Sequence, residues 1–283
     1  MRARAGGALL PEGRTAVMGI VNVTPDSFAD GGHHATAEQA VAHARRLIAE
    51  GADLIDIGGE STRPGAQPVA VEVERARVLP VVAALRAETG LPISVDTTKA
   101  EVAAAALAAG ADMVNDVSAG RFDSAMLPLV AERGAAVVLM HMQGTPATMQ
   151  QAPAYGDVVA EVAAFLAERA AAARSAGIDA ERIWVDPGIG FGKRPEHNLA
   201  LLAHLERLAA LGFPVLVGAS RKTFLGALGG EPVEARLAAS LAAAVLAVAH
   251  GARAVRVHDV APTRRAVAVA DAVGYASRVA GTR

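Results

Sequence analysis

The sequence predicts an α/β fold, a (β/α)8 TIM barrel in a single domain. Three observations support this prediction: the chain has 283 residues, short β-branched runs alternate about eight times with helical stretches, and no linker divides it into halves. A doubly wound sheet fits the same alternation, but the G-x-G-x-x-G phosphate fingerprint is absent after the first strand. We therefore expect residues 1–283 to form one barrel domain, with a short N-terminal extension over residues 1–14.

The expected strands are short runs of mostly apolar residues. They cover residues 16–23, 53–57, 93–95, 113–117, 136–141, 183–186, 214–218 and 254–257. Between the first two runs, Thr36 and Gln39 predict the capping box of a helix that Gly51 ends. A repeat supports the pattern, because "EGADLIDIGG", "AGADMVNDVS" and "HGARAVRVHD" each run from a helix end through a glycine to a strand with a polar tip.

The composition excludes several classes of function. The formal net charge is −2, and no run of Lys or Arg is dense enough to indicate nucleic-acid binding. The chain has no Cys, which excludes disulfides, thiolate metal sites and thiol nucleophiles. The N-terminal residues lack the apolar core of a secretory signal, and the longest apolar run, residues 237–249, is too short to span a bilayer. We expect a soluble cytoplasmic protein with no membrane or nucleic-acid partner.

A polar side chain stands at the carboxyl end of nearly every expected strand. These residues are Asn22, Asp56, Asp96, Asn115, His141, Asp186, the run Ser220, Arg221 and Lys222, and Arg256 with His258. In a barrel these ends meet on one face, where catalytic residues lie. One Asp or Asn alone is more often a helix cap or a loop-tying residue, but eight such ends together predict an active site.

Three expected connections, residues 24–35, 58–70 and 143–155, are longer than the usual two to six residues and could cover that face. The first contains Phe28 and the second contains Thr62 and Arg63. The alternative is that these segments are simply solvated loops.

The polar residues suggest a ligand. Asp96, Asp186 and Asn115 can accept hydrogen bonds from a 2-amino-4-oxo pyrimidine edge, and Lys222 could donate to the carbonyl or nitrogen of that ring. A flat ring would stack on Phe191, on the thioether of Met140 or on the guanidinium plane of Arg256.

Two anion sites are also expected. Arg256 and His258 alternate on one strand end and so share a face, which with Asn22 suits a phosphate or diphosphate. Residues 220–223, Ser220 to Thr223, begin a helix whose N–H groups favour a second anion such as a carboxylate.

Eight segments, in order and at barrel spacing, resemble the dihydropteroate synthases of folate biosynthesis. They are "MGIVNVTPDSFADGG" (18–32), "IDIGGESTRPGA" (55–66), "ISVDTTK" (93–99), "VNDVSAG" (114–120), "LMHMQGTPATMQ" (139–150), "VDPGIGFGK" (185–193), "GASRKTFLG" (218–226) and "RVHDV" (256–260).

The resemblance implies that a dihydropterin hydroxymethyl diphosphate is condensed with 4-aminobenzoate, with Mg²⁺ on the diphosphate. It implies that sulfonamides compete with aminobenzoate and that the protein is a homodimer. By the same resemblance, Asp96, Asn115, Asp186 and Lys222 hold the pterin, on which Arg256 stacks. Asn22, Arg256 and His258 hold the diphosphate, and Asn22 is also the Mg²⁺ ligand. Thr62, Arg63 and Phe28 close over the site. Pro64 and Phe28 line the aminobenzoate pocket, and Thr223 contacts the carboxylate of aminobenzoate.

The expected path is dissociative, because diphosphate leaves readily once its charge is neutralised and the electron-rich dihydropterin stabilises a methylene cation. The pterin diphosphate is expected to bind before aminobenzoate. Two other functions stay open, a pterin-dependent methyltransferase and a non-catalytic pterin-binding barrel. We expect His33 and His34 to be surface residues, and His141 and Asp56 to have structural roles.

Overall fold

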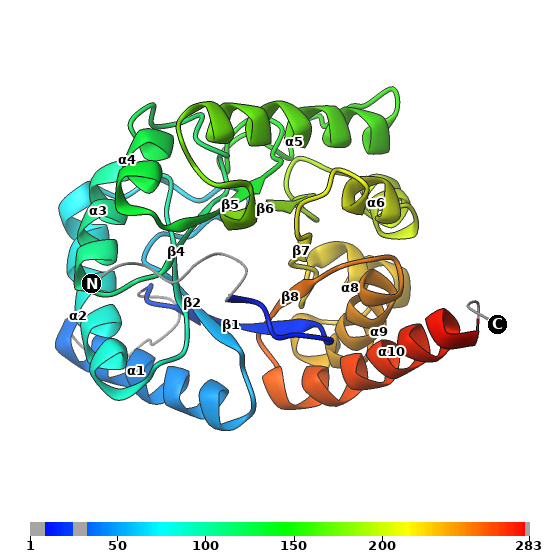
Figure 1. Ribbon diagram of the computed structural model, residues 1–283, viewed down its shortest axis with the longest axis horizontal. Coiled ribbons are helices and arrows are strands. Elements are labelled where there is room, and N and C mark those ends of the chain that lie inside the picture. Colours follow the sequence, from blue (N-terminus) through cyan, green and yellow to red (C-terminus); the bar gives the residue numbers. More distant parts are fainter. Residues whose placement is uncertain (1–8, 25–32, 281–283) are drawn as a thin grey trace.

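The computed structural model describes residues 9–24 and 33–280 (Figure 1). Strands and helices alternate along the chain as the sequence predicts. In order they are β1 Ala16–Asn22, α1 His33–Ala49, β2 Leu54–Gly58, α2 Val71–Glu88, β3 Ile93–Asp96, α3 Ala100–Ala109, β4 Met113–Asp116, α4 Met126–Arg133, β5 Ala136–Met140, α5 Val158–Ser175, η3 Ala180–Arg182, β6 Ile183–Asp186, α6 Pro195–Ala203, α7 Glu206–Ala209, β7 Leu216–Val217, α8 Thr223–Gly229, η4 Val233–Ala235, α9 Leu237–Ala249, β8 Ala254–Val257 and α10 Val260–Ala280.

The eight strands form one parallel sheet that curls into a barrel, with the helices outside it (Figure 1). The hydrogen-bonded order is β6-β5-β4-β3-β2-β1-β8-β7. The two edge strands meet through a single parallel bridge between Val185 and Val215, which closes the ring. The predicted single-domain TIM barrel is therefore confirmed.

Alternation along the strands separates the barrel interior from the layer under the helices. The interior is apolar toward the amino ends of the strands. The buried side chains there are Leu9, Ala16, Met18, Leu54, Met113, Ala136, Val138, Trp184, Leu216 and Ala254. Two positions further along four of these strands, the side chains become polar, at Asp56, Asn115, Asp186 and Arg256. On β3, Asp96 likewise follows the buried Ser94 by two positions. The carboxyl end of the barrel is therefore the polar end.

Two elements differ from the sequence-based expectation. Helix α1 begins at His33, so Thr36 lies inside the helix and is not its N-cap. The first residue of the run predicted at 214–218 is Pro214, which has no N–H for the ladder, and the regular strand β7 is only two residues long. Most other strand boundaries agree to within one residue.

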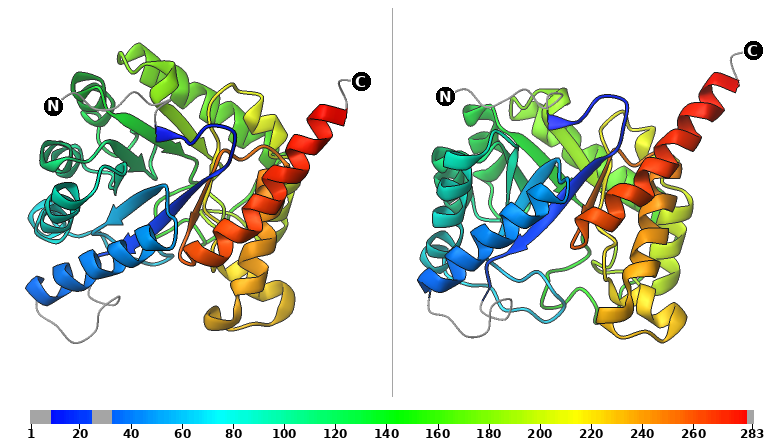
Figure 2. Two further views of the ribbon diagram at one scale, coloured as in Figure 1. Left: turned by 60° about the horizontal axis from the view of Figure 1, so that its bottom comes forward. Right: turned by 90° about the horizontal axis from the view of Figure 1, so that it is seen from below.

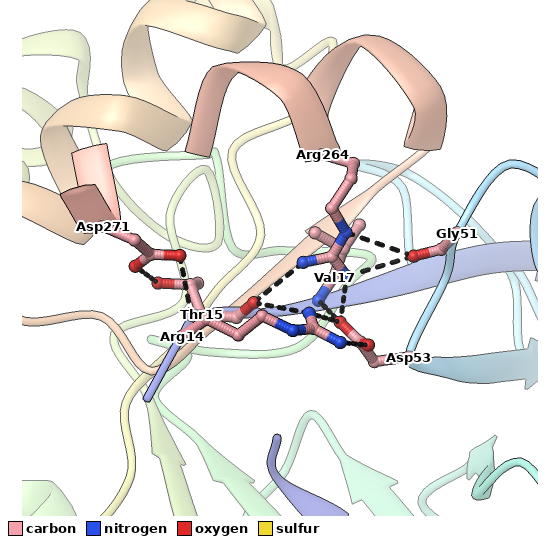
Figure 3. Close-up of polar contacts among 7 residues, drawn as sticks. All are labelled: Arg14, Thr15, Val17, Gly51, Asp53, Arg264 and Asp271. Atoms are coloured by element: carbon pink, nitrogen blue, oxygen red, sulfur yellow. Dashed lines mark hydrogen bonds and ion pairs between the residues drawn. The ribbon is translucent and has the colours of Figure 1, made fainter. Parts of the chain in front are cut away.

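Ion pairs and hydrogen bonds connect the segment before β1, the start of β2 and helix α10 at the amino ends of the strands (Figure 3). The Asp53 carboxylate accepts hydrogen bonds from Arg14 at 2.6 and 2.9 Å, from Arg264 and from the Val17 backbone N–H at 2.9 Å. Asp271 of α10 accepts from the Thr15 backbone N–H at 3.0 Å and from its hydroxyl at 2.7 Å. These contacts join the segment before β1 to the last helix.

Helices α9 and α10 lie side by side on the outside of the barrel (Figure 2). Within residues 9–24 and 33–280, no helix is long and apolar enough to cross a membrane.

Candidate active site

A buried ion-pair network crosses the polar end of the barrel. Arg256 of β8 donates from Nε to Asp56 Oδ2 at 2.6 Å and from Nη2 to Asp96 Oδ2 at 2.9 Å. Asn115 of β4 donates from Nδ2 to the same oxygen of Asp56 at 3.0 Å. Asp56 is fully buried and the Arg256 side chain is 20% exposed. The guanidinium group therefore has a fixed position at this polar end, the mouth of the barrel, and part of the Arg256 side chain stays exposed.

Asp186 and Lys222 lie on the other side of this mouth. Asp186 ends β6, and its Oδ1 accepts a hydrogen bond from the Gly188 backbone N–H at 2.7 Å. Lys222 precedes α8, and its Nζ lies 3.9 Å from the centroid of the Phe191 ring. One face of Phe191, which is among the residues expected to stack on a ligand, therefore supports the lysine in this structure.

Burial shifts the pKa values of these groups. Burial raises the pKa of Asp96 to about 7, although the charge of Arg256 opposes the shift. Burial raises the pKa of Asp186 to about 6, against the Gly188 hydrogen bond and the charge of Lys222. Burial and the nearby Arg256 lower the pKa of Lys222 to about 8. Two buried carboxyl groups with raised pKa values at one end of the barrel are typical of a functional site.

His258 lies beside Ser220, beyond the ends of β8 and β7. Ser220 Oγ accepts a hydrogen bond from the His258 backbone N–H at 3.3 Å and lies 3.0 Å from Nδ1 of the same residue. Burial and the charge of Arg256 lower the pKa of His258 to about 3, so the imidazole is neutral at pH 7. The neutral imidazole can still act as an N–H donor at this position.

The β2–α2 loop, residues 59–70, is fixed at its base. Lys99 Nζ donates to Glu60 Oε2 and to Glu74 Oε2, each at 2.5 Å. Glu60 Oε2 also accepts from the Val69 backbone N–H at 2.8 Å, which joins the two ends of the loop. Between these ends lie Thr62, Arg63 and Pro64, with Arg63 and Pro64 exposed.

The same loop contacts the β5–α5 loop, residues 141–157. The Gly65 backbone N–H donates to the Pro146 carbonyl at 3.0 Å. Burial and the charge of Arg256 are the main causes of the lowered pKa of Lys222, and the positive charge of Arg63 adds to them.

The structure brings together most of the residues singled out from the sequence. Asn22 ends β1, next to β8 in the sheet, and Met140 is buried at the end of β5, opposite Asp186. Thr223 is exposed at the start of α8. Phe28 lies outside the described residues, as do the side chains of His33 and His34.

Asp56 has the structural role expected of it, since it accepts hydrogen bonds from Arg256 and Asn115. Sequence reasoning missed one other residue. Lys193 was not singled out, yet it is 3% exposed and contacts His141. The signal for Lys193 was its place at the end of the "VDPGIGFGK" segment. His141 has the expected structural position, because its carbonyl and ring both contact that lysine.

Comparison with known proteins identifies the family. The family model described as pterin binding enzyme matches residues 18–258. Dihydropteroate synthase of Escherichia coli is 47% identical over 272 residues, which are 96% of this chain and 96% of that protein. The chain belongs to the dihydropteroate synthase family. It is an enzyme of folate biosynthesis, a transferase that forms pteroate.

Solved structures of this family have the same fold. Xanthomonas albilineans dihydropteroate synthase with 4-aminobenzoic acid has 58% sequence identity and a TM-score of 0.87, and the match covers 92% of this chain and 93% of that one. Yersinia pestis dihydropteroate synthase with a sulfonamide drug complex has 44% identity and a TM-score of 0.90, over 97% of this chain and 100% of that one.

Proposed function

We propose that this enzyme condenses 6-hydroxymethyl-7,8-dihydropterin diphosphate with 4-aminobenzoate, giving 7,8-dihydropteroate and diphosphate by a dissociative path. The observation that supports it most directly is the arrangement at the barrel mouth. Two buried carboxyl groups, Asp96 and Asp186, and the amide of Asn115 lie at the same end of the barrel as Lys222 and Arg256. Acceptors and donors are thus arranged for one edge of a pterin ring.

The pterin would lie against Met140 and Phe191 on one side and the Arg256 plane on the other. Met140 packs with Val117, Met142 and Met149, and Phe191 packs against this cluster. Lys222 would donate to the ring carbonyl or nitrogen. Since Asp56 and Asp96 hold Arg256 in place, its guanidinium plane needs little reorganisation to receive the ring.

The diphosphate would bind Asn22, Arg256 and His258. Ser220 could select the useful tautomer of His258: its oxygen accepts from the backbone N–H, and its hydroxyl proton would be donated to Nδ1. Nε2 then has the remaining proton and can donate to a phosphate oxygen. As the C–O bond breaks, its electrons leave with the diphosphate, whose growing charge these donors stabilise.

Mg²⁺ fits as an ion held mainly by the substrate. No group of three or more His, Cys, Asp or Glu side chains within the described ranges could hold a metal. Mg²⁺ on a diphosphate keeps several waters and needs only one or two protein ligands, and the Asn22 amide oxygen can be one. When bound, the ion would neutralise diphosphate charge.

Aminobenzoate would bind under the β2–α2 loop. Its neutral amine attacks the methylene carbon and then loses a proton, so the enzyme needs only to position it and exclude water. Thr62, Arg63, Pro64 and Phe28 would close over it, and Ser220, Thr223 and the start of α8 would meet its carboxylate. Sulfonamides would compete for this place once the pterin diphosphate has bound. Calorimetric binding of a sulfonamide without diphosphate would contradict that order.

We also propose a homodimer located in the cytoplasm. Leu246 of α9 and Val269 and Val273 of α10 are 52%, 64% and 61% exposed, on helices that pack side by side. An apolar surface of this kind favours a second copy of the chain. Sedimentation of the purified protein would give the number of subunits, and cell fractionation would give the location.

The reaction can be tested with purified protein, dihydropterin diphosphate and Mg²⁺. Diphosphate release that requires aminobenzoate would establish the condensation, and the absence of dihydropteroate would refute it.

Arg256→Ala should abolish turnover and weaken binding of the pterin diphosphate, because the diphosphate and the pterin ring both lose their contact with the guanidinium group. The control Arg45→Ala removes only an exposed pair with Glu88 on the outer helices and should keep normal turnover.

A further inference from the structure

Lys193 is a buried ammonium group with several partners. It lies in the β6–α6 loop, residues 187–194, and is 3% exposed. Its Nζ donates to the carbonyl oxygens of Gly188 and Phe191 at 3.0 Å and of His141 at 3.3 Å, and lies 2.9 Å from His141 Nδ1. Burial lowers the pKa of His141 to about 2, so this ring is neutral. One cation thus joins the loop to the end of β5.

The loop backbone lies directly against that strand end. Gly188 has a φ of +66°, and a Cβ there would stand 1.9 Å from the His141 carbonyl oxygen. Gly192 has a φ of +60°, and a Cβ there would stand 2.7 Å from the Gln143 carbonyl oxygen. The close approach turns several carbonyl oxygens toward one buried point, where they need a donor.

The same loop supports two residues that face the proposed pterin. The Gly188 backbone N–H donates to Asp186 Oδ1 at 2.7 Å. The Phe191 ring lies 3.9 Å from Lys222 Nζ. A shift of the loop away from β5 would therefore alter the surroundings of Asp186 and Lys222 together.

We propose that Lys193 is a positioning residue of the pterin site, which holds the β6–α6 loop on β5 so that Gly188 orients Asp186 and Phe191 supports Lys222. This inference rests on the proposed function and adds a residue that does not touch the substrate. A lysine that only stabilises the fold would affect both substrates alike. A positioning role for Lys193 instead predicts weaker binding of the pterin substrate and little change for aminobenzoate.

Charge adds a second consequence. The positive charges of Lys222, Arg256 and Lys193 all oppose the rise that burial causes in the pKa of Asp186. Burial and Lys222 lower the pKa of Lys193 to about 7, while Asp186 opposes this change, so the lysine is mostly protonated near pH 6, where Asp186 titrates. Removing the ammonium charge should raise the pKa of Asp186 further.

The test compares Lys193→Met with Arg169→Met. Arg169 of α5 also donates to a backbone carbonyl, that of Ala119 at 2.8 Å, but it contacts no residue assigned to the pterin. In Lys193→Met we expect the KM for pterin diphosphate to rise about tenfold and the KM for aminobenzoate to change less than about twofold. The pH below which a phosphate-free hydroxymethylpterin loses affinity should rise by about one unit. Arg169→Met should behave as wild type in both respects.

A second variant separates geometry from charge. Lys193→Gln keeps donors for the carbonyl oxygens but has no charge, so it should show the shifted pH dependence with a smaller rise in KM. Unchanged pterin affinity and pH dependence in both variants would overturn the proposal, and so would an equal loss for both substrates.

The proposal can also be tested if neither variant folds. The wild-type protein has only three lysines, so ¹⁵N spectra can follow the Lys193 side chain directly. Its signal should titrate near pH 7 and shift when hydroxymethylpterin binds, and a signal that does not respond to the ligand would overturn the proposal. If wild type forms no dihydropteroate, the proposed reaction fails, but the pterin-binding comparison still tests Lys193.

Discussion

At the scale of single residues, the site depends on contacts between distant parts of the chain. The strand-end residues could be predicted from the sequence, because side chains two positions apart share a face and the ends of parallel strands meet. The pairing of Asp56 with Arg256 could not, since the two residues are 200 positions apart and meet only after the ring closes. The neutral state of His258 likewise depends on burial, which no motif records.

The raised pKa values of Asp96 and Asp186 predict how pterin binding depends on pH. A carboxyl group must be ionised to accept both N–H groups of the ring edge, and it becomes protonated as the pH falls through its pKa. Because these pKa values are about 7 and about 6, affinity should decrease below neutrality, much earlier than for an ordinary carboxyl group.

Calorimetry with a phosphate-free hydroxymethylpterin between about pH 5 and 8 measures this dependence, since no phosphate titrates in that ligand. Asp186→Asn should bind more weakly at pH 8 and show a shallower decrease, because only Asp96 then titrates. Affinity that stays constant down to about pH 5 would contradict the prediction.

At the scale of elements, the sequence predicted the strands well and their connections less well. Buried β-branched runs of four or more residues have few alternatives to a central strand. The start of α1 and the length of β7 depend on neighbouring segments, which local pattern does not reveal. The fixed base of the β2–α2 loop was also hidden, because Glu60, Glu74 and Lys99 come from three separate elements.

Lys99→Met should loosen the β2–α2 loop. Without the ammonium group, Glu60 keeps only the Val69 N–H, and the loop is less restrained over the site. The KM for aminobenzoate should rise about tenfold, while pterin affinity measured by calorimetry changes little.

Lys99→Met also leaves Glu74 buried and unpaired, which lowers stability. The double variant Lys99→Met with Glu74→Leu removes that charge and should recover stability without recovering the KM. If the KM for aminobenzoate is normal in the stable double variant, Lys99 has no role in placing the loop.

At the scale of the whole molecule, the two ends of the barrel have different tasks. The amino end has the Asp53 and Asp271 contacts, which tie the chain together (Figure 3). The carboxyl end has the buried groups with shifted pKa values. Changes at one end should therefore affect stability and changes at the other should affect the reaction.

Asp53→Ala tests this division. It leaves Arg14 and Arg264 without their carboxylate, and the free energy of unfolding should decrease by about 1 to 2 kcal/mol, because solvent screens the exposed Arg14. The kcat and both KM values should stay near wild type at 25 °C. Denaturant titration measures the first quantity and steady-state assays the others.

The surface variant Glu88→Gln, which breaks an exposed pair with Arg45, should leave the free energy of unfolding close to that of wild type. A large loss of turnover in folded Asp53→Ala would show that the two ends are coupled.

The single bridge between Val185 and Val215 has a mechanical consequence. Every other neighbouring pair of strands shares a ladder, but this pair shares one bridge, so it is the weakest joint of the ring. Asp186 stands on one side of the joint and Lys222 on the other. A pterin bound by both side chains would connect the end of β6 to the segment after β7. The bound substrate would then stabilise the weakest contact between neighbouring strands of the barrel.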